Sequence, residues 1–581
     1  MGTKLFLTFV KRQIDSVVLL FSAFRIRVLA LLNTLSGLSS LSVFLILVMD
    51  FGFQLSDQNE LLFSNFILYI YFYFCIDILL RLVLDKNWFK YFVSRPFDLL
   101  IFTPILGLLP TLPFFSLYLI SQGALFFICL GRIGHISKLL ELIKVKPAQL
   151  FLFGFLFVIF LGSLLLSLPV STTYGSHISY VDALFTSFSA VCVTGLVVND
   201  VGVDFTYFGQ IVILLLIQIG GLGIISFSIL LSLVTHKKIS LIVSKGYQAS
   251  YATFSLNETF KAILFIFKVT LFFELLGAAL LYWGWQGQFD TVNEGMFYAI
   301  FHSISAFCNA GFSLFSDSLV SHALHVPTVM TISFLIILGG LGFPVLFNLF
   351  YYQHKSYFGV RIKLQTKLAL YVTGLLLVIG TLVIYLGEFN GALSGYSLQD
   401  KFLLSWFQSV TSRTAGFNTM NLNYFGGHTL LMLMIFMIIG ANPGSTGGGI
   451  KTTTFGLIVV SFWSNLKSSR HVNLMKRRIE EKNIVEAFSL LFLAILFIGL
   501  FGYGLFLIEK GSFLPIMFEV VSAFGTVGLS LGVTQELSNG GKILIMVLMF
   551  IGRIGPLSIL YALSKPKPTV NYAYPKEDLV L

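Results

Sequence analysis

Four glycine-centred tetrapeptides are the part of this sequence best suited to bind an ion through the polypeptide backbone. Each follows a short stretch rich in aromatic residues, and the glycines recur roughly 110 residues apart, which indicates four copies of one unit. Glycine permits unusual backbone dihedral angles, and a ring of carbonyl groups can replace the hydration shell of a cation. The sequence therefore predicts one ring formed by four segments: Val193, Thr194, Gly195 and Leu196; Asn309, Ala310, Gly311 and Phe312; Thr414, Ala415, Gly416 and Phe417; and Thr526, Val527, Gly528 and Leu529.

A second glycine cluster interrupts a long apolar stretch at 428–464. Pro443 precedes Gly444, Ser445, Thr446, Gly447, Gly448 and Gly449, and Lys451 follows. Irregular backbone at membrane depth is tolerated where it is buried in protein or lines a water-filled path. The cluster also resembles a phosphate-binding loop, but Ile450 separates the last glycine from Lys451 and the preceding run has the length of a membrane span. We therefore interpret it as a break in a spanning helix.

Arg553 is the most informative charge, because it lies deep within the last apolar run. An ionisable residue inside a membrane is costly and marks a functional site by default. Two readings remain open: a charge that lines the path, or an arginine that snorkels or bonds between helices. Arg413, just before the third tetrapeptide, is expected to be a structural charge at the outer mouth.

The elements that position these residues are membrane-spanning helices. The 581 residues are 56% hydrophobic and 11% charged, with a mean hydropathy of +0.90, whereas soluble chains carry about 25% charged residues. Apolar runs of about 20 residues recur, which is enough to cross a bilayer. We predict an all-α membrane protein with eight spans around the four segments, at 150–169, 207–233, 260–284, 326–351, 366–387, 428–464, 486–508 and 541–563, and four earlier spans at 37–54, 61–84, 97–119 and 121–143.

The basic residues predict how the chain is oriented. Lysine and arginine gather in the loops after 233, 351 and 464, whereas the segments that hold the tetrapeptides carry mainly acidic residues. Because basic loops remain in the cytoplasm, we expect both termini there and the tetrapeptides on the outer side. The net charge of +11 is explained by this topology, and no nucleic-acid partner is expected.

The four tetrapeptides resemble the filter sequences of the Trk/Ktr/HKT superfamily of cation transporters, over about 150–565. The resemblance implies a homodimer with one pore per protomer and a cytosolic ring of nucleotide-binding regulatory subunits (TrkA/KtrA-like). It also implies that 444–449 and Arg553 gate the pore. Members with glycine in all four filters favour potassium, so we expect K⁺ at the backbone carbonyls of Thr194, Asn309, Thr414 and Thr526, no covalent cofactor, and nucleotide only on the separate subunit.

The chain divides into an N-terminal module and a pore domain. Residues 150–581 hold four predicted repeats, 150–235, 257–352, 364–465 and 484–565. Residues 1–149 form a separate four-helix module. Within it, Arg132, His135 and Lys138 recur every third residue, and Asp77 and Asp98 lie in or near spans. Such spacing faintly resembles a voltage sensor, and a purely structural module is the alternative.

These observations together predict potassium uptake across the inner membrane of a bacterial cell by a multi-pass protein. Two alternatives remain: a sodium-permeable or non-selective monovalent cation transporter of the same family, and a membrane sensor that does not conduct. No metalloprotease motif or nucleophile elbow occurs, so we do not expect an enzyme.

Overall fold

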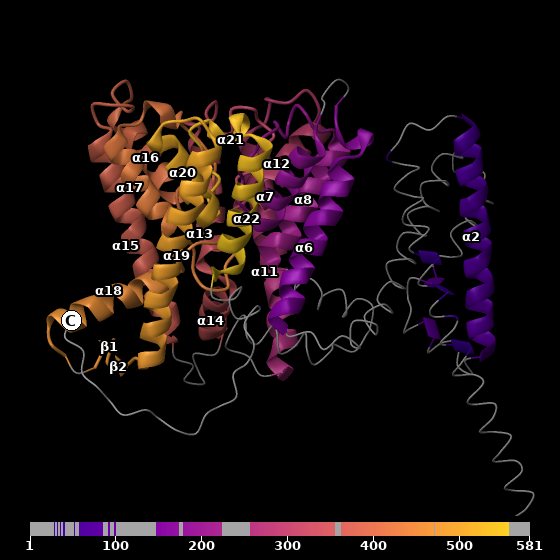
Figure 1. Ribbon diagram of the computed structural model, residues 1–581, viewed down its shortest axis with the longest axis horizontal. Coiled ribbons are helices and arrows are strands. Elements are labelled where there is room, and N and C mark those ends of the chain that lie inside the picture. Colours follow the sequence, from indigo (N-terminus) through magenta and orange to yellow (C-terminus); the bar gives the residue numbers. More distant parts are fainter. Residues whose placement is uncertain are drawn as a thin grey trace, which may run out of the picture.

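The computed structural model describes residues 57–84, 147–173, 178–223, 256–354, 362–469 and 471–556, together with a few separate positions between 28 and 99. Several predictions fall outside these residues: the spans at 97–119 and 121–143, the Arg132, His135 and Lys138 series, and both termini. Of the N-terminal module, one long helix is described, α2 (Asp57–Leu84), which lies to one side of the main body (Figure 1).

The main body consists of four successive helical units. In each, a long helix of 20 to 29 residues is followed by a shorter one, which we call the pore helix, and then by a third helix of 12 to 16 residues. The order is α6 (Pro147–Leu166), α7 (Tyr180–Cys192), α8 (Tyr207–Leu222); α11 (Leu256–Gly284), α12 (Val292–Phe307), α13 (Val326–Leu341); α15 (Leu364–Gly387), α16 (Leu398–Thr411), α17 (Gly427–Ile438); and α19 (Glu481–Ile508), α20 (Phe513–Gly525), α22 (Asn539–Ile554).

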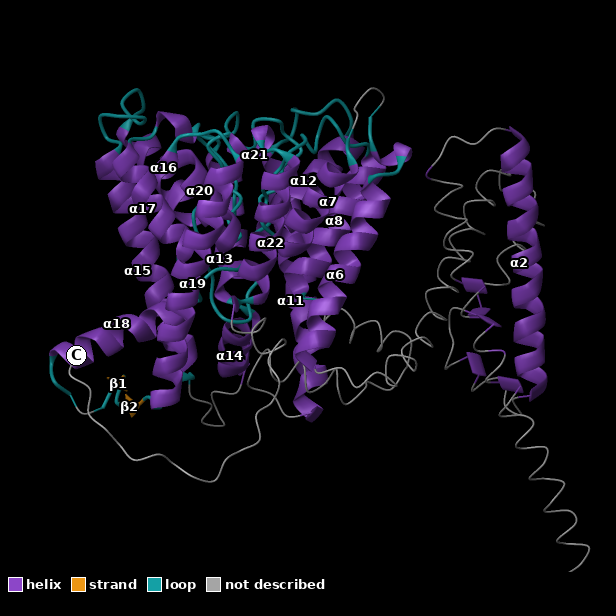
Figure 2. Ribbon diagram, viewed as in Figure 1, coloured by secondary structure: helices purple, strands orange, loops and turns teal. Residues whose placement is uncertain are grey.

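Smaller elements complete the body. The helices α14 (Phe343–His354) and α18 (Thr452–Leu466) extend the second and third units. They lie at one end of the bundle together with a hairpin formed by β1 (Asn473–Leu474) and β2 (Arg477–Arg478), while most of the loops gather at the opposite end (Figure 2). Short helical turns at η2 (Pro169–Ser171), η4 (Leu422–Tyr424) and α21 (Val533–Glu536) lie in those loops.

Three of the four pore helices begin with the same capping chemistry. A serine or threonine hydroxyl accepts a hydrogen bond from the backbone amide of an acidic residue three positions later, which satisfies an otherwise unpaired amide and places a negative charge in the first turn. The pairs are Ser179 with Asp182, Thr291 with Glu294, and Ser397 with Asp400. In the fourth unit Pro515 occupies this position and has no amide hydrogen to donate.

The expected continuous span at 326–351 is wrong, because it bends by 93° between α13 and α14. Gly342 lies at the bend with a φ of +85°, a conformation that glycine adopts at low cost. Gly223 and Gly555 end α8 and α22 with φ of +82° and +90°, and the predicted continuations to 233 and 563 lie outside the described residues. The predicted break within 428–464 is present between Ile438 and Thr452.

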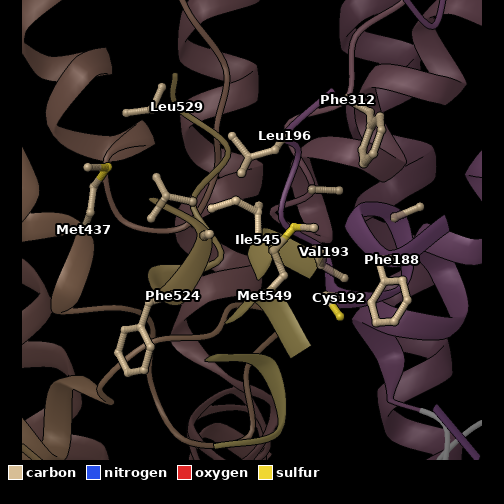
Figure 3. Packing of buried hydrophobic residues seen from close by; sticks show 14 of the residues in the cluster. Phe188, Cys192, Val193, Leu196, Phe312, Met437, Phe524, Leu529, Ile545 and Met549 are labelled. Atoms are coloured by element: carbon tan, nitrogen blue, oxygen red, sulfur yellow. The ribbon is translucent and has the colours of Figure 1, made fainter. Parts of the chain in front are cut away.

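The fold is that of a multi-pass membrane protein. Within the described part of the chain, three helices are long and apolar enough to cross a bilayer, and the bent α13–α14 pair would make a fourth. Large apolar side chains face outward along them, among them Phe272, Leu375 and Phe492, which suits a lipid surface. The interior is also apolar: Figure 3 shows Val193, Leu196, Phe312 and Leu529 buried in one cluster with Ile545 and Met549 of α22.

Candidate functional site: an ion filter above an intramembrane loop

The four tetrapeptides, which we call filter segments, share one backbone conformation. The first residue and the glycine of each have positive φ: Val193 and Gly195 (56° and 86°), Asn309 and Gly311 (59° and 69°), Thr414 and Gly416 (76° and 82°), and Thr526 and Gly528 (51° and 91°). A non-glycine residue with positive φ is strained, and such strain concentrates at functional sites. Four occurrences at matched positions indicate one repeated structure.

The four filter glycines close into a ring. A Cβ atom added to Gly195 would collide with the carbonyl oxygen of Ala310, and the same holds for each following pair around the circle: Gly311 with Ala415, Gly416 with Val527, and Gly528 with Thr194. Each glycine therefore lies against the residue that precedes the next unit's glycine. The contact order returns to its start, so the units follow one another around a common axis, with the second opposite the fourth.

This register corrects one detail of the predicted ion site. Thr194 precedes its glycine directly, whereas Asn309, Thr414 and Thr526 lie two residues before theirs, so the four carbonyls named from the sequence do not form one layer. The matched layers are Val193 with Asn309, Thr414 and Thr526, and Thr194 with Ala310, Ala415 and Val527. The second layer contacts the glycines of the neighbouring units.

Hydroxyl groups of the pore helices hold the filter segments in place. Ser189 and Ser522 accept hydrogen bonds from the amides of Gly195 and Gly528, both at 3.1 Å. Ser305 and Thr411 instead donate to the carbonyls that follow the glycines, those of Phe312 and Phe417, both at 2.8 Å. These four residues were not predicted from the sequence. Their signal was a hydroxyl residue that recurs six positions before the filter glycine, or five in the third unit.

The predicted gate is an irregular segment, residues 439–451, which we call the intramembrane loop. Its two ends are paired: the Gly440 amide donates to the Ile450 carbonyl at 2.9 Å, and the Ile450 amide donates to the Ile438 carbonyl at 3.1 Å. The loop also bonds the second unit, where the Phe343 amide donates to the Gly444 carbonyl at 3.0 Å. This bond lies at the bend after Gly342, so the bend and the loop support each other.

The intramembrane loop also contacts the filter itself. The Gly448 amide donates to the Thr526 hydroxyl at 3.0 Å. The Thr446 hydroxyl donates to the carbonyl of Phe307, the last residue of the second pore helix, at 3.3 Å. A Cβ on Gly447 would collide with the Thr414 hydroxyl. The loop therefore lies directly against the inner end of the filter, and small residues are required for this approach.

Two cationic side chains bond this region. Arg553 of α22 donates through its two terminal nitrogens to the carbonyls of Thr446 in the loop and Gly220 in α8. Lys451 donates to the carbonyl of Gly447 at 2.7 Å. Arg553 thus bonds between helices, as one of the two readings from the sequence held, and its role along the ion path stays a prediction.

Arg413 does not lie at the outer mouth, where we expected it. It is buried, with 8% of its surface exposed, and it lines a small cavity together with Gly340, Thr373 and Ala441. Gly340 accepts a hydrogen bond from Asn442 of the intramembrane loop, so Arg413 lies level with the loop. The third pore helix ends at Thr411, so Ser412 and Arg413 lie between it and the filter segment, whereas α7 and α20 end directly before theirs.

The known proteins that this chain resembles are cation transporters. The family described as "TrkH: Cation transport protein" matches residues 155–573. "Ktr system potassium uptake protein B" of Bacillus subtilis (strain 168) is 39% identical over 453 residues, which cover 76% of this chain and 98% of the relative. The protein of that name from Vibrio alginolyticus is also 39% identical, and the match covers 75% of this chain and 95% of that relative. "Potassium/sodium uptake protein NtpJ" of Enterococcus hirae is 34% identical, and the match covers 75% of this chain and 98% of that relative.

The fold is also found in a solved structure of a transporter. The crystal structure of the potassium transporter TrkH from Vibrio parahaemolyticus matches with a TM-score of 0.60 over 80% of this chain and 96% of that one, at 21% sequence identity. The resemblance stated from the filter segments is thus confirmed by sequence and by fold.

Proposed function

The chain belongs to the TrkH family of cation transport proteins, and on that premise we propose that it carries potassium into a bacterial cell across the cell membrane. Relatives named for potassium uptake cover most of the chain. One relative is named for potassium and sodium together, so the choice between these two ions is the property to measure.

The closed ring of filter segments is the observation that carries this proposal. It places the carbonyls of Thr194, Ala310, Ala415 and Val527 in one layer, each against the glycine of a neighbouring unit. Carbonyl oxygens that replace a hydration shell suit a monovalent cation. The side chains at both ends of the segments are buried in the core, so the backbone is the part of the chain left to bind the ion.

The intramembrane loop and Arg553 form the gate in this account. The loop lies under the filter and is held by hydrogen bonds to three units, through Thr526, Phe343 and the Arg553 bridge to Gly220. A fixed cation beside the path raises the electrostatic cost for a permeating cation. Opening requires that the loop leave the filter and that these bonds break or rearrange.

The assembly part of the proposal rests on the resemblance. We include in it a homodimer, cytoplasmic termini, and a nucleotide-binding regulatory ring on the cytoplasmic side. The end of the bundle opposite the filter carries the exposed residues Lys476, Arg477 and Arg478 of the hairpin, which supply a basic face for such a partner.

Growth of a bacterium that lacks its own potassium uptake tests the transport proposal. The wild-type chain should restore growth at low potassium. Gly195→Ser should fail to restore it, because a side chain there meets the Ala310 carbonyl at a positive φ. Gly374→Ser is the matched control, since a Cβ on Gly374 has no atom within 4 Å. Equal growth of both variants at equal expression would contradict the proposal that these four segments form the ion filter.

A further inference from the structure

One position on the pore helices is polar and buried in all four units. In the first three units this position is followed by a serine that donates a hydrogen bond to a carbonyl of the preceding long helix. The bonds are Ser187 to Ile159 (2.6 Å), Ser303 to Glu274 (2.6 Å) and Ser409 to Leu377 (3.0 Å). The residues at the position itself are Thr186, His302 and Gln408, and the equivalent residue of the fourth unit is Glu519. Each has at most 1% of its surface exposed.

These four residues differ in what they hold. In the second and fourth units, the side chain bonds the serine two residues beyond the filter glycine: His302 with Ser313 at 3.0 Å, and Glu519 with Ser530 at 2.7 Å. In the first and third units, the Thr186 hydroxyl and both amide atoms of Gln408 have no hydrogen-bond partner. The outer end of the filter is therefore anchored from two opposite sides.

The partners of His302 determine its tautomer. Its Nδ1 lies 2.8 Å from the Tyr298 carbonyl oxygen, which can only accept, so Nδ1 carries the hydrogen. Nε2 of the neutral ring is then an acceptor, and the Ser313 hydroxyl donates to it. The same hydroxyl lies 3.1 Å from a second acceptor, the Ser318 carbonyl. Ser313 has one hydrogen for these two acceptors, and neutral His302 competes for it.

The loop held by Ser313 also holds the next unit. Ser318 accepts a hydrogen bond from the Asn418 amide at 3.1 Å, and the Leu319 amide donates to the Asn418 carbonyl at 2.9 Å. Asn418 lies two residues beyond the filter glycine of the third unit, at the position that Gln408 does not reach. His302 thus acts through residues 313–319 on the outer ends of two filter segments.

Protonation of His302 would reverse this arrangement. With a second proton, Nε2 becomes a donor to Ser313, and the Ser313 hydrogen passes to the Ser318 carbonyl. Aromatic rings surround the imidazole, with centroids 5.3 Å (Trp285) and 4.9 Å (Phe315) away. Of the described groups around it, the ionisable ones are the Tyr298 ring on α12 and His322, which lies across Phe315 on the outer loop. Trp285 lies directly after α11, and Phe417 belongs to the third unit.

We propose that His302 is a positioning residue for ion selection, which in its neutral form fixes the outer ends of the second and third filter segments through Ser313 and Ser318. The inference rests on the proposed transport function and adds a residue that sets how well potassium is distinguished from sodium.

Ion flux from purified protein in liposomes tests this, with the potassium-to-sodium flux ratio measured at neutral pH. His302→Phe keeps a ring but removes the acceptor, and Ser313→Ala removes the donor. Each should lower the ratio roughly two- to tenfold at neutral pH, the effect of one lost net hydrogen bond. The double variant should match either single variant, because both remove the same bond.

His302→Gln separates positioning from packing. Its amide oxygen can accept from Ser313, so the ratio should stay near the wild-type value, whereas His302→Phe should lower it. His428→Phe is the control, an exposed histidine on the same side of the bundle. If His302→Phe does not fold, Ser313→Ala alone decides.

The outcomes separate the two proposals. Potassium flux through the wild-type chain with an unchanged ratio in Ser313→Ala overturns the role of His302 and leaves transport intact. A ratio in His302→Gln that is as low as in His302→Phe also overturns it. Absence of any flux through the wild-type chain overturns the transport proposal itself.

Discussion

The hydroxyl of Thr526 accepts a hydrogen bond from the backbone amide of Gly448 at 3.0 Å. Thr526 begins the fourth filter segment, and Gly448 lies in the intramembrane loop. The residue thus serves two structures at once: its backbone takes the strained filter conformation, with φ of 51°, while its side chain holds the loop. A change at this one residue can alter both selection and opening.

Thr526→Val tests this connection. Valine keeps the branched shape but leaves the Gly448 amide without an acceptor, so the closed loop loses one net hydrogen bond, about 0.5–1.5 kcal/mol. We expect basal potassium flux in liposomes to rise roughly two- to tenfold with the ion preference retained. Thr453→Val, in α18 beyond the loop, should behave as wild type. A lower flux would show that this hydrogen bond stabilises the open state and not the closed one.

Arg553→Ala should raise flux by a larger factor. The substitution removes a fixed cation and also frees the Thr446 and Gly220 carbonyls that it bridges. Loss of both the barrier and the tether favours an open path. The measurement is potassium uptake in an uptake-deficient bacterium at matched expression. Uptake equal to that of the wild type would show that Arg553 has no part in the gate, and Lys482→Ala, at an exposed site, serves as the control.

The ion pair between Lys542 and Asp182 should contribute to stability rather than transport. Their atoms lie 2.6 Å apart, the side chains are 11% and 15% exposed, and the pair joins α22 of the last unit to α7 of the first. Lys542→Met leaves a mostly buried carboxylate without its partner, which should cost about 1.5–3 kcal/mol and lower the thermal midpoint of the purified protein. The exposed pair Lys482 and Glu486, 4.0 Å apart, gives the control: Lys482→Met should change the midpoint little.

His322 should make the outer loop sensitive to acid. Burial lowers the pKa of His322 below its ordinary value of 6.5, opposed by Asp317 and assisted by His325. The unfolded chain therefore binds this proton first, so stability is complete above about pH 6.5 and decreases as the pH falls towards the folded-state pKa. His322→Gln should reduce the acid-induced drop in thermal midpoint. A midpoint that depends on pH equally in both proteins would exclude His322 as the cause.

The helices and the filter were predictable from sequence, because both depend on local patterns. Apolar runs of membrane length and a glycine motif that recurs four times need no knowledge of distant contacts. The order of the four units around the ring, and the layer of carbonyl groups to which Thr194 belongs, could be determined only from the structure. From the sequence, the carbonyl of Thr194 was expected to lie in one layer with that of Asn309, although the strained residue of the first unit is Val193.

Other features depend on contacts between distant segments. The bend at Gly342 is supported by a hydrogen bond from Phe343 to Gly444, about 100 residues further along the chain, and an apolar pattern cannot indicate it. Arg413 lies level with the loop, lining a cavity with residues of two other elements, and its place in the sequence directly before Thr414 did not indicate this. The role of His302 was not predicted either, because it depends on comparing the four pore helices after they are aligned by their serines.

Potassium and sodium flux into liposomes, with the wild-type chain compared against Gly528→Ser and Gly374→Ser, tests the closed ring of filter segments most directly. A Cβ on Gly528 lies 3.0 Å from the Cα of Gly195 and collides with the Thr194 carbonyl, whereas one on Gly374 meets nothing. The account predicts selective potassium flux for the wild type and Gly374→Ser, and loss of flux or of selectivity for Gly528→Ser. Selective potassium flux through Gly528→Ser at the wild-type rate would contradict it.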